Sequence, residues 1–426
     1  MAASTKMENK VELPEDYKLP IKRRDPISMT VLSVLVIFMA VTTSGTSVMS
    51  FAGATGWFNI PDLSVPSVPT LWAFSVIAVV LTALAWQRAV ARKRLSGLYF
   101  GGVGVIFVVA FLIWTVAGKQ GSIMPVVSLL VGGLALAVPL IFGSLSGVVC
   151  ERSGVINIAI EGQLLFGAFL GAVTASIFSN AYLGLIGALI GGALVGVLLA
   201  LFTVTLRTDH IIVGVVLNML VIGLTSFFYS TVLSDNPDLN VVTALTPIPI
   251  PILKDIPFIG PIFFNQSLLV YLVYVAAIGL QFALFNTRWG LRTRACGEHP
   301  KAADTVGIKV NVTRWINVVA ASALAGLGGA FFTLGAGLAF SKEMSAGNGF
   351  IALAAMIIGR WNPKGAVAAS LLFGFATNLG SIMQSVGSPL PAEFMLMLPY
   401  VVTILAVAGF VGAVRAPAAE GKPYPA

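Results

Sequence analysis

The stretch YLGLIGALIGGALVGVLLALFTVTL, from Tyr182 to Leu206, contains no charged side chain. A helix needs about 20 apolar residues to cross the roughly 30 Å of hydrocarbon in a bilayer. It belongs to an uncharged run that covers residues 162–206, and further runs of this kind cover residues 256–287, 315–341 and 365–392. The sequence therefore predicts an all-α integral membrane protein.

The composition of the whole chain agrees with this prediction. Of the 426 residues, 57% are hydrophobic and only 10% are charged, whereas the surface of a soluble protein needs many more charges. The net charge of +8 does not indicate nucleic acid, because the basic residues cluster beside the apolar runs and not on one soluble face. Cys150 and Cys296 lie next to such basic clusters, so we expect no disulfide. Membrane lipid is the expected surrounding.

The uncharged runs predict about 10–12 transmembrane helices. The candidate spans are 27–48, 71–87, 98–117, 125–149, 158–178, 182–206, 211–233, 267–285, 315–338, 350–359, 366–383 and 394–414. With the N-terminus inside, 21 of the 25 Lys and Arg residues fall on the cytoplasmic side and three on the other. Because basic residues accumulate on the inner side of membranes, both termini are expected to be cytoplasmic.

The chain divides into four parts. Residues 1–26 are an N-terminal tail, 27–118 are extra transmembrane helices, 119–414 are the core, and 415–426 are a second tail. The first 20 residues and the segment from Ala416 are expected to be disordered. Within the core, residues 234–266 contain six prolines, which predicts a semi-rigid external cover without long helices.

Charged and amide side chains interrupt the apolar pattern in GSLSGVVCERSGVINIAIEGQ, residues 143–163. Such groups are costly at membrane depth unless they face a cavity or one another. Five of them are candidates for lining or shaping a substrate path: Glu151, Arg152, Asn157, Glu161 and Gln163. The glycines of this stretch allow a broken helix near the midplane, as in many transporters. The alternative is a short cytoplasmic turn in which Glu151 and Arg152 form a solvated pair.

Further polar features lie elsewhere in the core. SAGNG at residues 345–349 precedes a short apolar run that stops at GRWNPKG, residues 359–365. Two interrupted segments suggest an inverted repeat with the path between them, although no residue-level repeat is visible. Asn218 and Asn378 lie inside apolar spans and could face the same cavity, or could form hydrogen bonds between helices.

The longest predicted cytoplasmic loop covers residues 286–313. Pro300 suits a first helical turn and Gly307 a C-terminal stop, which predicts a helix of one or two turns. The small side chains of Ala302 and Ala303 suit insertion into a partner's groove. An ordinary loop with the usual positive charge is the alternative.

Two stretches carry a resemblance to a known family. ERSGVINIAIEGQLLFGAF, residues 151–169, resembles the motif of bacterial ABC-transporter permeases of the ribose/nucleoside (branched-chain-type) branch, and its wording is closest to nucleoside-uptake permeases. GLRTRACGEHPKAADTVGI, residues 290–308, looks like that family's ATPase-coupling loop. The resemblance covers residues 125–414 and implies a coupling role for Gly290, Arg294, Gly297, Glu298, Pro300, Ala302, Ala303 and Gly307.

This resemblance implies an importer in the bacterial plasma membrane. An external substrate-binding lipoprotein would deliver the ligand, two permease subunits, identical or paralogous, would form the path, and cytoplasmic ABC ATPases would drive alternating access. The sequence contains no Gly-x-x-x-x-Gly-Lys-Ser/Thr stretch, so the partner would use the ATP and no cofactor is expected in this chain. Two departures from the family pattern are Ala159, where a glycine is usual, and the long N-terminal part.

Other functions stay open. The ligand could be a simple sugar, or the chain could be an ion-coupled secondary transporter that protonates Glu151 and Glu161. A membrane enzyme would need a converging nucleophile, base or metal set. His210 and His299 have no neighbours at metal-ligand spacing, so we expect neither a catalytic nor a metal site.

Overall fold

The computed structural model describes residues 23–51, 60–93, 96–119, 121–386, 394, 397 and 415–425. The chain divides into two compact units, Met1–Val48 with Ser64–Ser122 and Met49–Leu63 with Ile123–Ala426. The expected disorder of the first 20 residues, and almost all of the predicted span 394–414, lie outside the described residues.

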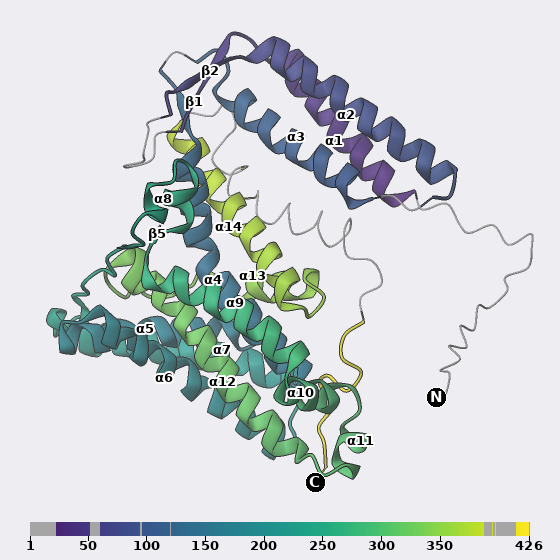
Figure 1. Cartoon of the computed structure of the whole chain (residues 1–426). Coiled ribbons are helices and arrows are strands. Elements are labelled where there is room, and N and C mark those ends of the chain that lie inside the picture. Colours follow the sequence, from purple (N-terminus) through teal and green to yellow (C-terminus); the bar gives the residue numbers. More distant parts are fainter. Residues whose placement is uncertain are drawn as a thin grey trace, which may run out of the picture. The chain divides into compact units, whose positions relative to one another are not determined.

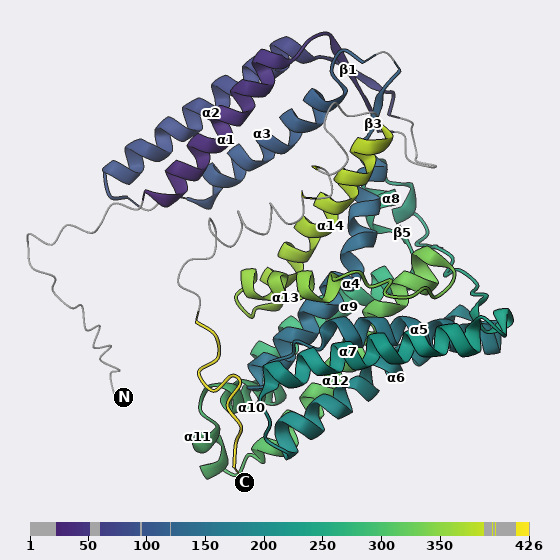
Figure 2. The same cartoon turned by 180° about the vertical axis from the view of Figure 1, so that it is seen from behind.

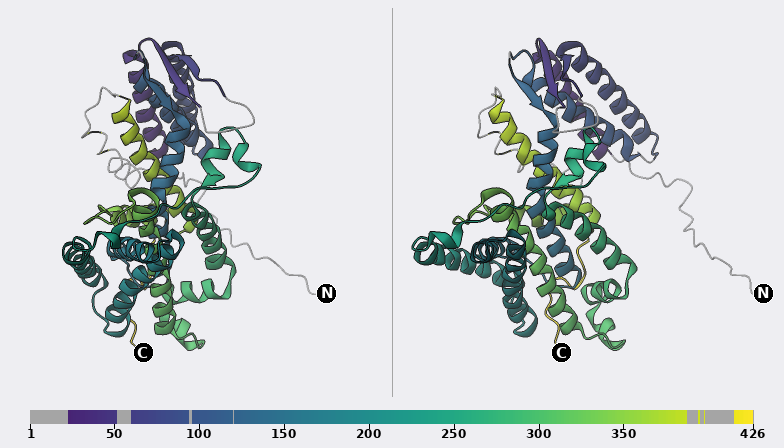
Figure 3. Two further views of the ribbon diagram at one scale, coloured as in Figure 1. Left: turned by 90° about the vertical axis from the view of Figure 1, so that its left-hand side faces the viewer. Right: turned by 60° about the vertical axis from the view of Figure 1, so that its left-hand side comes forward.

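The described part of the first unit is a three-helix bundle (Figure 3). Its helices are α1 (Arg24–Thr42), α2 (Ser67–Val90) and α3 (Gly97–Val116). Hydroxyl groups join them: the Ser33 and Thr82 oxygens are 2.9 Å apart, and the Trp114 indole donates to Thr42 over 2.9 Å. Hydrogen bonds of this kind hold helices together where the surrounding lipid is as apolar as the side chains.

The second unit contains the remaining long helices (Figure 1). They are α4 (Val126–Arg152), α5 (Ile160–Phe178), α6 (Ala181–Ala200), α7 (His210–Phe228), α9 (Leu268–Asn286), α12 (Val310–Ala330) and α14 (Pro363–Ser385). Three of them continue into π-helical turns, η1 (Leu201–Thr205), η2 (Tyr229–Leu233) and η5 (Phe331–Gly337). Ten helices in the described part of the chain are long and apolar enough to cross a membrane. The predicted all-α membrane fold is confirmed.

Glycines allow α5, α6 and α12 to pack with their backbones in contact. A Cβ atom on Gly326 of α12 would lie 2.3 Å from the carbonyl oxygen of Ala188 and 2.6 Å from the amide nitrogen of Gly192, both in α6. A Cβ on Gly167 of α5 would lie 2.3 Å from the Gly326 oxygen. Small residues at such contacts let membrane helices approach closely, so these three helices form the centre of the unit.

Helix α13 (Asn348–Ile358) is too short to cross a bilayer, so the predicted span 350–359 is wrong. Its 11 residues extend about 16 Å at 1.5 Å per residue, roughly half of the hydrocarbon thickness. An irregular stretch, residues 338–347, precedes it, and a tight turn at Gly359–Asn362 joins it to α14. Arg360 and Trp361 in that turn have left-handed φ angles of 57° and 51°. The predicted interruption of the second region is confirmed.

Short elements make up the proline-rich segment and the unit boundaries. They are β1 (Thr46–Ser50), β2 (Leu63–Pro66), β3 (Ile123–Pro125), η3 (Pro237–Asn240), β4 (Ile248–Pro249), η4 (Leu253–Asp255), α8 (Ile259–Phe263) and β5 (Asn265–Gln266). Strands β4 and β5 are antiparallel, with Ile248 opposite Gln266. Asn240 exchanges two hydrogen bonds with the Phe340 backbone, at 2.9 and 2.7 Å. This exchange ties the proline-rich segment to the chain that follows α12.

Two helices fill the predicted loop 286–313. Helix α11 (Pro300–Thr305) begins at the proline, and Gly307 follows it with a φ angle of +83°, so the predicted short helix is confirmed. Helix α10 (Arg288–Glu298) precedes it. The sequence pattern did not predict α10, because its eleven residues include three arginines and lack an apolar run.

The expectation that the segment from Ala416 is disordered is wrong for the described residues 415–425. Pro417 and Ala419 are buried, and the Ala419 amide donates to the Gly297 carbonyl over 2.9 Å. Figures 1 and 2 show this segment running beside α10 and α11. Its small side chains allow close packing, which composition alone does not reveal.

Candidate functional site

The polar stretch 143–163 contains the end of α4, a non-helical link and the start of α5. Helix α4 continues past Gly143 and Gly147 to Arg152, and α5 begins at Ile160. The break therefore lies at residues 153–159. Glu151 is only 2% exposed, so it is not half of a solvated pair.

Glu161 binds the N-terminal end of α13, 186 residues further along the chain at Gly347. Its Oε1 accepts hydrogen bonds from the Ser345 hydroxyl at 2.6 Å and from the Gly347 amide at 2.8 Å. Its Oε2 accepts from the Gly349 amide at 2.6 Å. A helix N-terminus carries partial positive charge and unpaired N–H groups, so a 6% exposed carboxylate satisfies them there.

Arg152 and Glu151 bind the opposite end of the same helix. The Arg152 guanidinium donates to the Trp361 carbonyl over 2.9 Å and to the Arg360 carbonyl over 3.5 Å. The Trp361 indole donates to Glu151 Oε2. A cation at the C-terminal carbonyls and an anion at the N-terminus both suit the helix dipole. The 151–161 stretch thus brackets α13.

The expected pairing of Glu151 with Arg152 is wrong. In the described residues the ion pair of Arg152 is with Glu298, at 3.9 Å. Adjacent residues at the end of one helix point in different directions, and each therefore finds its own partner.

Asn157 and Gln163 form a closed pair of amides. Asn157 Nδ2 donates to Gln163 Oε1 over 3.1 Å, and Gln163 Nε2 donates back to Asn157 Oδ1 over 3.0 Å. Gln163 also donates to the Ser322 hydroxyl of α12, and Asn157 to Ser146 of α4. In this conformation these amides fix the link between α4, α5 and α12.

Asn218 and Asn378 bind helix backbones. Asn218 of α7 accepts from the Gly162 amide over 2.8 Å and donates to the Ile158 carbonyl over 2.9 Å. It therefore joins the five polar residues of the 151–163 stretch. Asn378 of α14 donates to the Leu129 carbonyl over 2.8 Å, near the start of α4, and lies apart from that group.

Two glycines of the predicted coupling set mark tight backbone contacts. A Cβ on Gly290 would lie 2.2 Å from the Ala283 oxygen, so a glycine permits the sharp turn between α9 and α10. A Cβ on Gly297 would lie 2.3 Å from the Arg152 oxygen. The end of α10 therefore touches the end of α4, and Arg294 packs over the Phe285 ring at 5.1 Å.

The exposed face of α11 differs from the prediction. Ala302 is exposed, but Ala303 is buried among Cys296 and Val310. Val306, which the sequence pattern did not indicate, is 74% exposed directly after α11.

Three further residues could not be identified from the sequence. Arg314 of α12 is 1% exposed, yet in the sequence it counted only as one more basic residue. The Tyr274 hydroxyl and Gln281 Oε1, seven residues apart on α9, are buried without a hydrogen-bond partner among the described residues. A periodicity of seven places them on one helix face, and buried polar atoms are nearly always paired in proteins.

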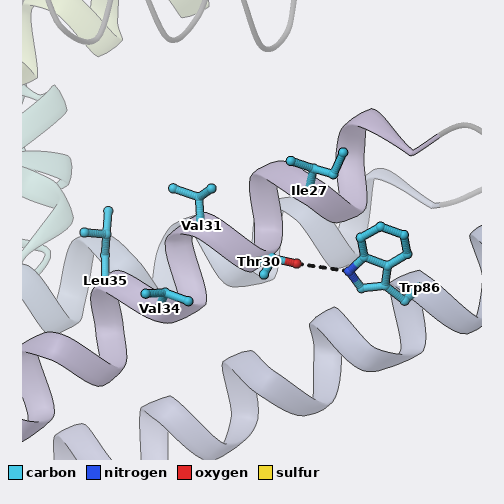
Figure 4. A pocket seen from close by; sticks show the side chains of 6 residues that line it. All are labelled: Ile27, Thr30, Val31, Val34, Leu35 and Trp86. Carbon is cyan, nitrogen blue, oxygen red and sulfur yellow. Dashed lines mark hydrogen bonds between the residues drawn. The ribbon is translucent and has the colours of Figure 1, made fainter.

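The groove in Figure 4 contains none of the predicted site residues. Its volume is about 290 Å³, and its lining residues are Ile27, Thr30, Val31, Val34, Leu35 and Trp86. The Trp86 indole donates to the Thr30 hydroxyl over 3.0 Å, and the remaining lining is hydrocarbon. An apolar groove in the three-helix unit suits lipid and not a polar solute.

Comparison with known proteins gives one family and several relatives. Residues 129–407 match the family described as branched-chain amino acid transport system / permease component. The chain is 39% identical over 316 residues to the guanosine ABC transporter permease protein NupQ of Bacillus subtilis, which covers 71% of this chain and 98% of that protein.

Two other relatives extend this comparison. The chain is 43% identical over 301 residues to the nucleoside ABC transporter permease protein NupC of Lactococcus lactis subsp. cremoris, covering 68% and 94% of the two chains. It is 32% identical over 254 residues to the putative glucose ABC transporter permease protein TsgC13 of Haloferax volcanii, covering 58% and 75%. No solved structure matches. The three-helix unit lies before the first residue of the family match.

Proposed function

We propose, from the premise that this chain belongs to the family of branched-chain amino acid transport system permease components, that it is the permease subunit of an ATP-driven nucleoside importer. It is a multi-pass protein of the bacterial cell membrane. The observation that carries the proposal is the similarity, over 98% and 94% of their lengths, to relatives named for guanosine and nucleoside transport. The relative named for glucose is less similar and less fully covered.

The family implies which partner subunits carry out the other steps of transport. An ATPase on the cytoplasmic side would hydrolyse ATP, since this sequence has no phosphate-binding Gly-x-x-x-x-Gly-Lys-Ser/Thr stretch. A second permease subunit would complete the path, and an external binding protein would deliver the ligand. Both chain termini would be cytoplasmic.

Helices α10 and α11 would face the ATPase. The exposed Val306 after α11 offers an apolar contact, and the close packing of Gly297 on the Arg152 backbone joins these helices to α4. Since Arg152 also binds the end of α13, a movement of α10 and α11 can reach the interrupted helix through direct contacts.

Tyr274 and Gln281 are the side chains that we propose for ligand contact. A nucleoside carries ribose hydroxyls and base edges that donate and accept hydrogen bonds. Tyr274 and Gln281, which carry the unpartnered atoms, are about 10 Å apart along the α9 axis at 1.5 Å per residue. The amides of Asn157 and Gln163, by contrast, already have partners.

Replacing Gln281 with leucine is expected to lower nucleoside uptake at least tenfold without lowering the thermal stability of the purified protein. The reason is that the buried Gln281 Oε1 has no hydrogen-bond partner among the described residues, so removing this acceptor is neutral or favourable for stability. Tyr274→Phe is the second variant. Uptake kinetics and thermal unfolding in detergent measure the two effects. Uptake at the wild-type rate in both variants would exclude these side chains as ligand contacts.

Uptake of radiolabelled nucleosides tests the proposed function as a whole. Cells that express this chain with its ATPase and binding protein are expected to accumulate purine or pyrimidine nucleosides. Replacement of the ATPase Walker lysine should reduce uptake to background, because ATP binding needs that lysine. Uptake by this chain alone would instead favour a secondary transporter. Uptake of simple sugars without nucleosides would favour a sugar permease.

A further inference from the structure

The C-terminal segment makes specific contacts with three separate parts of the second unit. The Ala419 amide donates to the Gly297 carbonyl at the end of α10, over 2.9 Å, and the Gly421 amide donates to the Gly154 carbonyl of the α4–α5 link, over 3.1 Å. The Tyr424 hydroxyl donates to the Asp304 carboxylate of α11 over 3.0 Å. Residues 415–425 are called the strap from here on.

Arg314 holds the strap, α10 and the α4–α5 link together. Its guanidinium donates to the Ser153 carbonyl over 3.1 Å, to the Cys296 carbonyl over 3.4 Å and to the Lys422 carbonyl over 2.9 Å. These three acceptors come from three different segments. Gly154 makes room for the guanidinium, since a Cβ there would lie 2.5 Å from Arg314 Nη2.

Burial of the Arg314 guanidinium has a free-energy cost that its hydrogen bonds must offset. Burying a charge is expensive unless hydrogen bonds replace its hydration, and among the described residues no carboxylate lies within ion-pair distance of this guanidinium. The planar group offers five N–H donors in a fixed geometry. A lysine could supply the charge but could not reach three carbonyls in this arrangement.

The strap also reaches the C-terminal end of α13, which is called its base from here on. The half-buried Glu420 side chain lies beside the Glu151 carboxyl, which itself accepts the Trp361 indole hydrogen bond. Burial raises the pKa of Glu420. The strap and the base of α13 therefore meet at Glu151.

We propose that Arg314 and the strap act as positioning elements for coupling, by making α10, α11 and the α4–α5 link move as one body with the base of α13. This inference rests on the proposed ABC permease function. Without the strap, α10 stays joined to the α4–α5 region through Arg314, which binds both Cys296 and Ser153, through Gly297 and through the Arg152–Glu298 pair. A partly exposed pair of that kind contributes little to stability, and the Lys422 carbonyl of the strap is the third acceptor that holds Arg314 in place.

The experiment uses the full transporter in proteoliposomes and measures nucleoside uptake and ATP hydrolysis together. Deletion of residues 415–426 is expected to lower the uptake per ATP about tenfold while the ATPase stays bound and active. Tyr424→Phe removes the hydrogen bond to the Asp304 carboxylate and is expected to lower the ratio severalfold. Arg314→Lys should resemble the deletion. Pro425→Ala, at an exposed position, is the matched control.

A cross-linking experiment distinguishes a strap that positions α10 from a strap that inhibits transport. Ala418→Cys with Glu298→Cys, joined by a short bis-maleimide, would hold the strap against α10, because the Ala418 amide lies 3.3 Å from Glu298 Oε2. Uptake that persists after cross-linking supports a strap that stays bound through the cycle. Uptake that stops on cross-linking, relative to the same double-cysteine variant before cross-linking, would overturn the inference in favour of an inhibitory segment that must leave.

Failure of this inference is distinguishable from failure of the function. Wild-type liposomes without ATP-dependent uptake would contradict the proposed function itself. Normal wild-type uptake together with an unchanged uptake per ATP in the deletion and in Tyr424→Phe would contradict only the strap. A purely structural role would lower the amount of assembled transporter and leave the uptake per ATP of the remaining complexes unchanged.

Discussion

Glu161→Ala is expected to abolish uptake and to lower the thermal stability of the purified permease. The substitution leaves the partly buried amide of Gly347, the buried amide of Gly349 and the buried hydroxyl of Ser345 without their acceptor. Each buried donor without a partner costs about 1–3 kcal/mol, and α13 also loses the anion at its N-terminus, worth about 0.3–2 kcal/mol. Uptake assays and thermal unfolding in detergent measure the loss.

Two variants sharpen this prediction. Glu161→Gln keeps one acceptor oxygen and should retain part of the uptake, whereas a proton-coupled carrier that needs Glu161 to titrate would lose all of it. Glu343→Ala is the matched control, because Glu343 lies exposed in the stretch that precedes α13. Wild-type stability in Glu161→Ala would show that the carboxylate does not hold α13.

Gly326→Ala is expected to destabilise the permease by about 3 kcal/mol or more, beyond the usual 1–3 kcal/mol of overpacking. The new Cβ would meet backbone atoms of Ala188 and Gly192 at 2.3 and 2.6 Å. Backbone atoms inside a helix cannot rotate away as a side chain can, so α6 and α12 would have to separate. The yield of monodisperse protein and its unfolding temperature measure the effect.

Glycine-to-alanine substitutions at open helix positions should have the opposite effect on stability. At Gly223 of α7 and Gly279 of α9, an added Cβ would have no neighbouring atom within 4 Å, and alanine favours helix over glycine by about 0.5–1 kcal/mol. Gly223→Ala and Gly279→Ala are therefore expected to be neutral or stabilising. A melting temperature of Gly326→Ala equal to theirs would contradict the close packing of α5, α6 and α12.

The sequence alone was sufficient for ten of the twelve predicted spans, for the short α11 and for the family. In hydrocarbon every backbone N–H and C=O must be paired within the chain, and a helix pairs them locally. An uncharged run of about 20 residues therefore has one stable structure whatever its neighbours do. Pro300 and Gly307 act locally too, since each restricts or permits particular φ angles.

Only the tertiary structure decided which groups the polar side chains bind. The donors to the Glu161 carboxylate come from Ser345, Gly347 and Gly349, and no local pattern links those positions to it. Arg314 looked like one more basic residue near a membrane surface, yet it is buried among three carbonyls. The role of Asn157 and Gln163 in ligand transport stays a prediction.

The strap is a whole segment whose contacts the sequence did not reveal. Its Pro/Ala-rich composition indicated disorder, because such a sequence cannot bury enough apolar surface by itself. In the fold it binds surfaces that α10, α12 and the α4–α5 link provide together. Sequence determines the structure that each short segment adopts by itself, because backbone hydrogen bonds within a helix are local. The partners of buried charges and docked segments depend instead on which distant surfaces the packing of helices brings together.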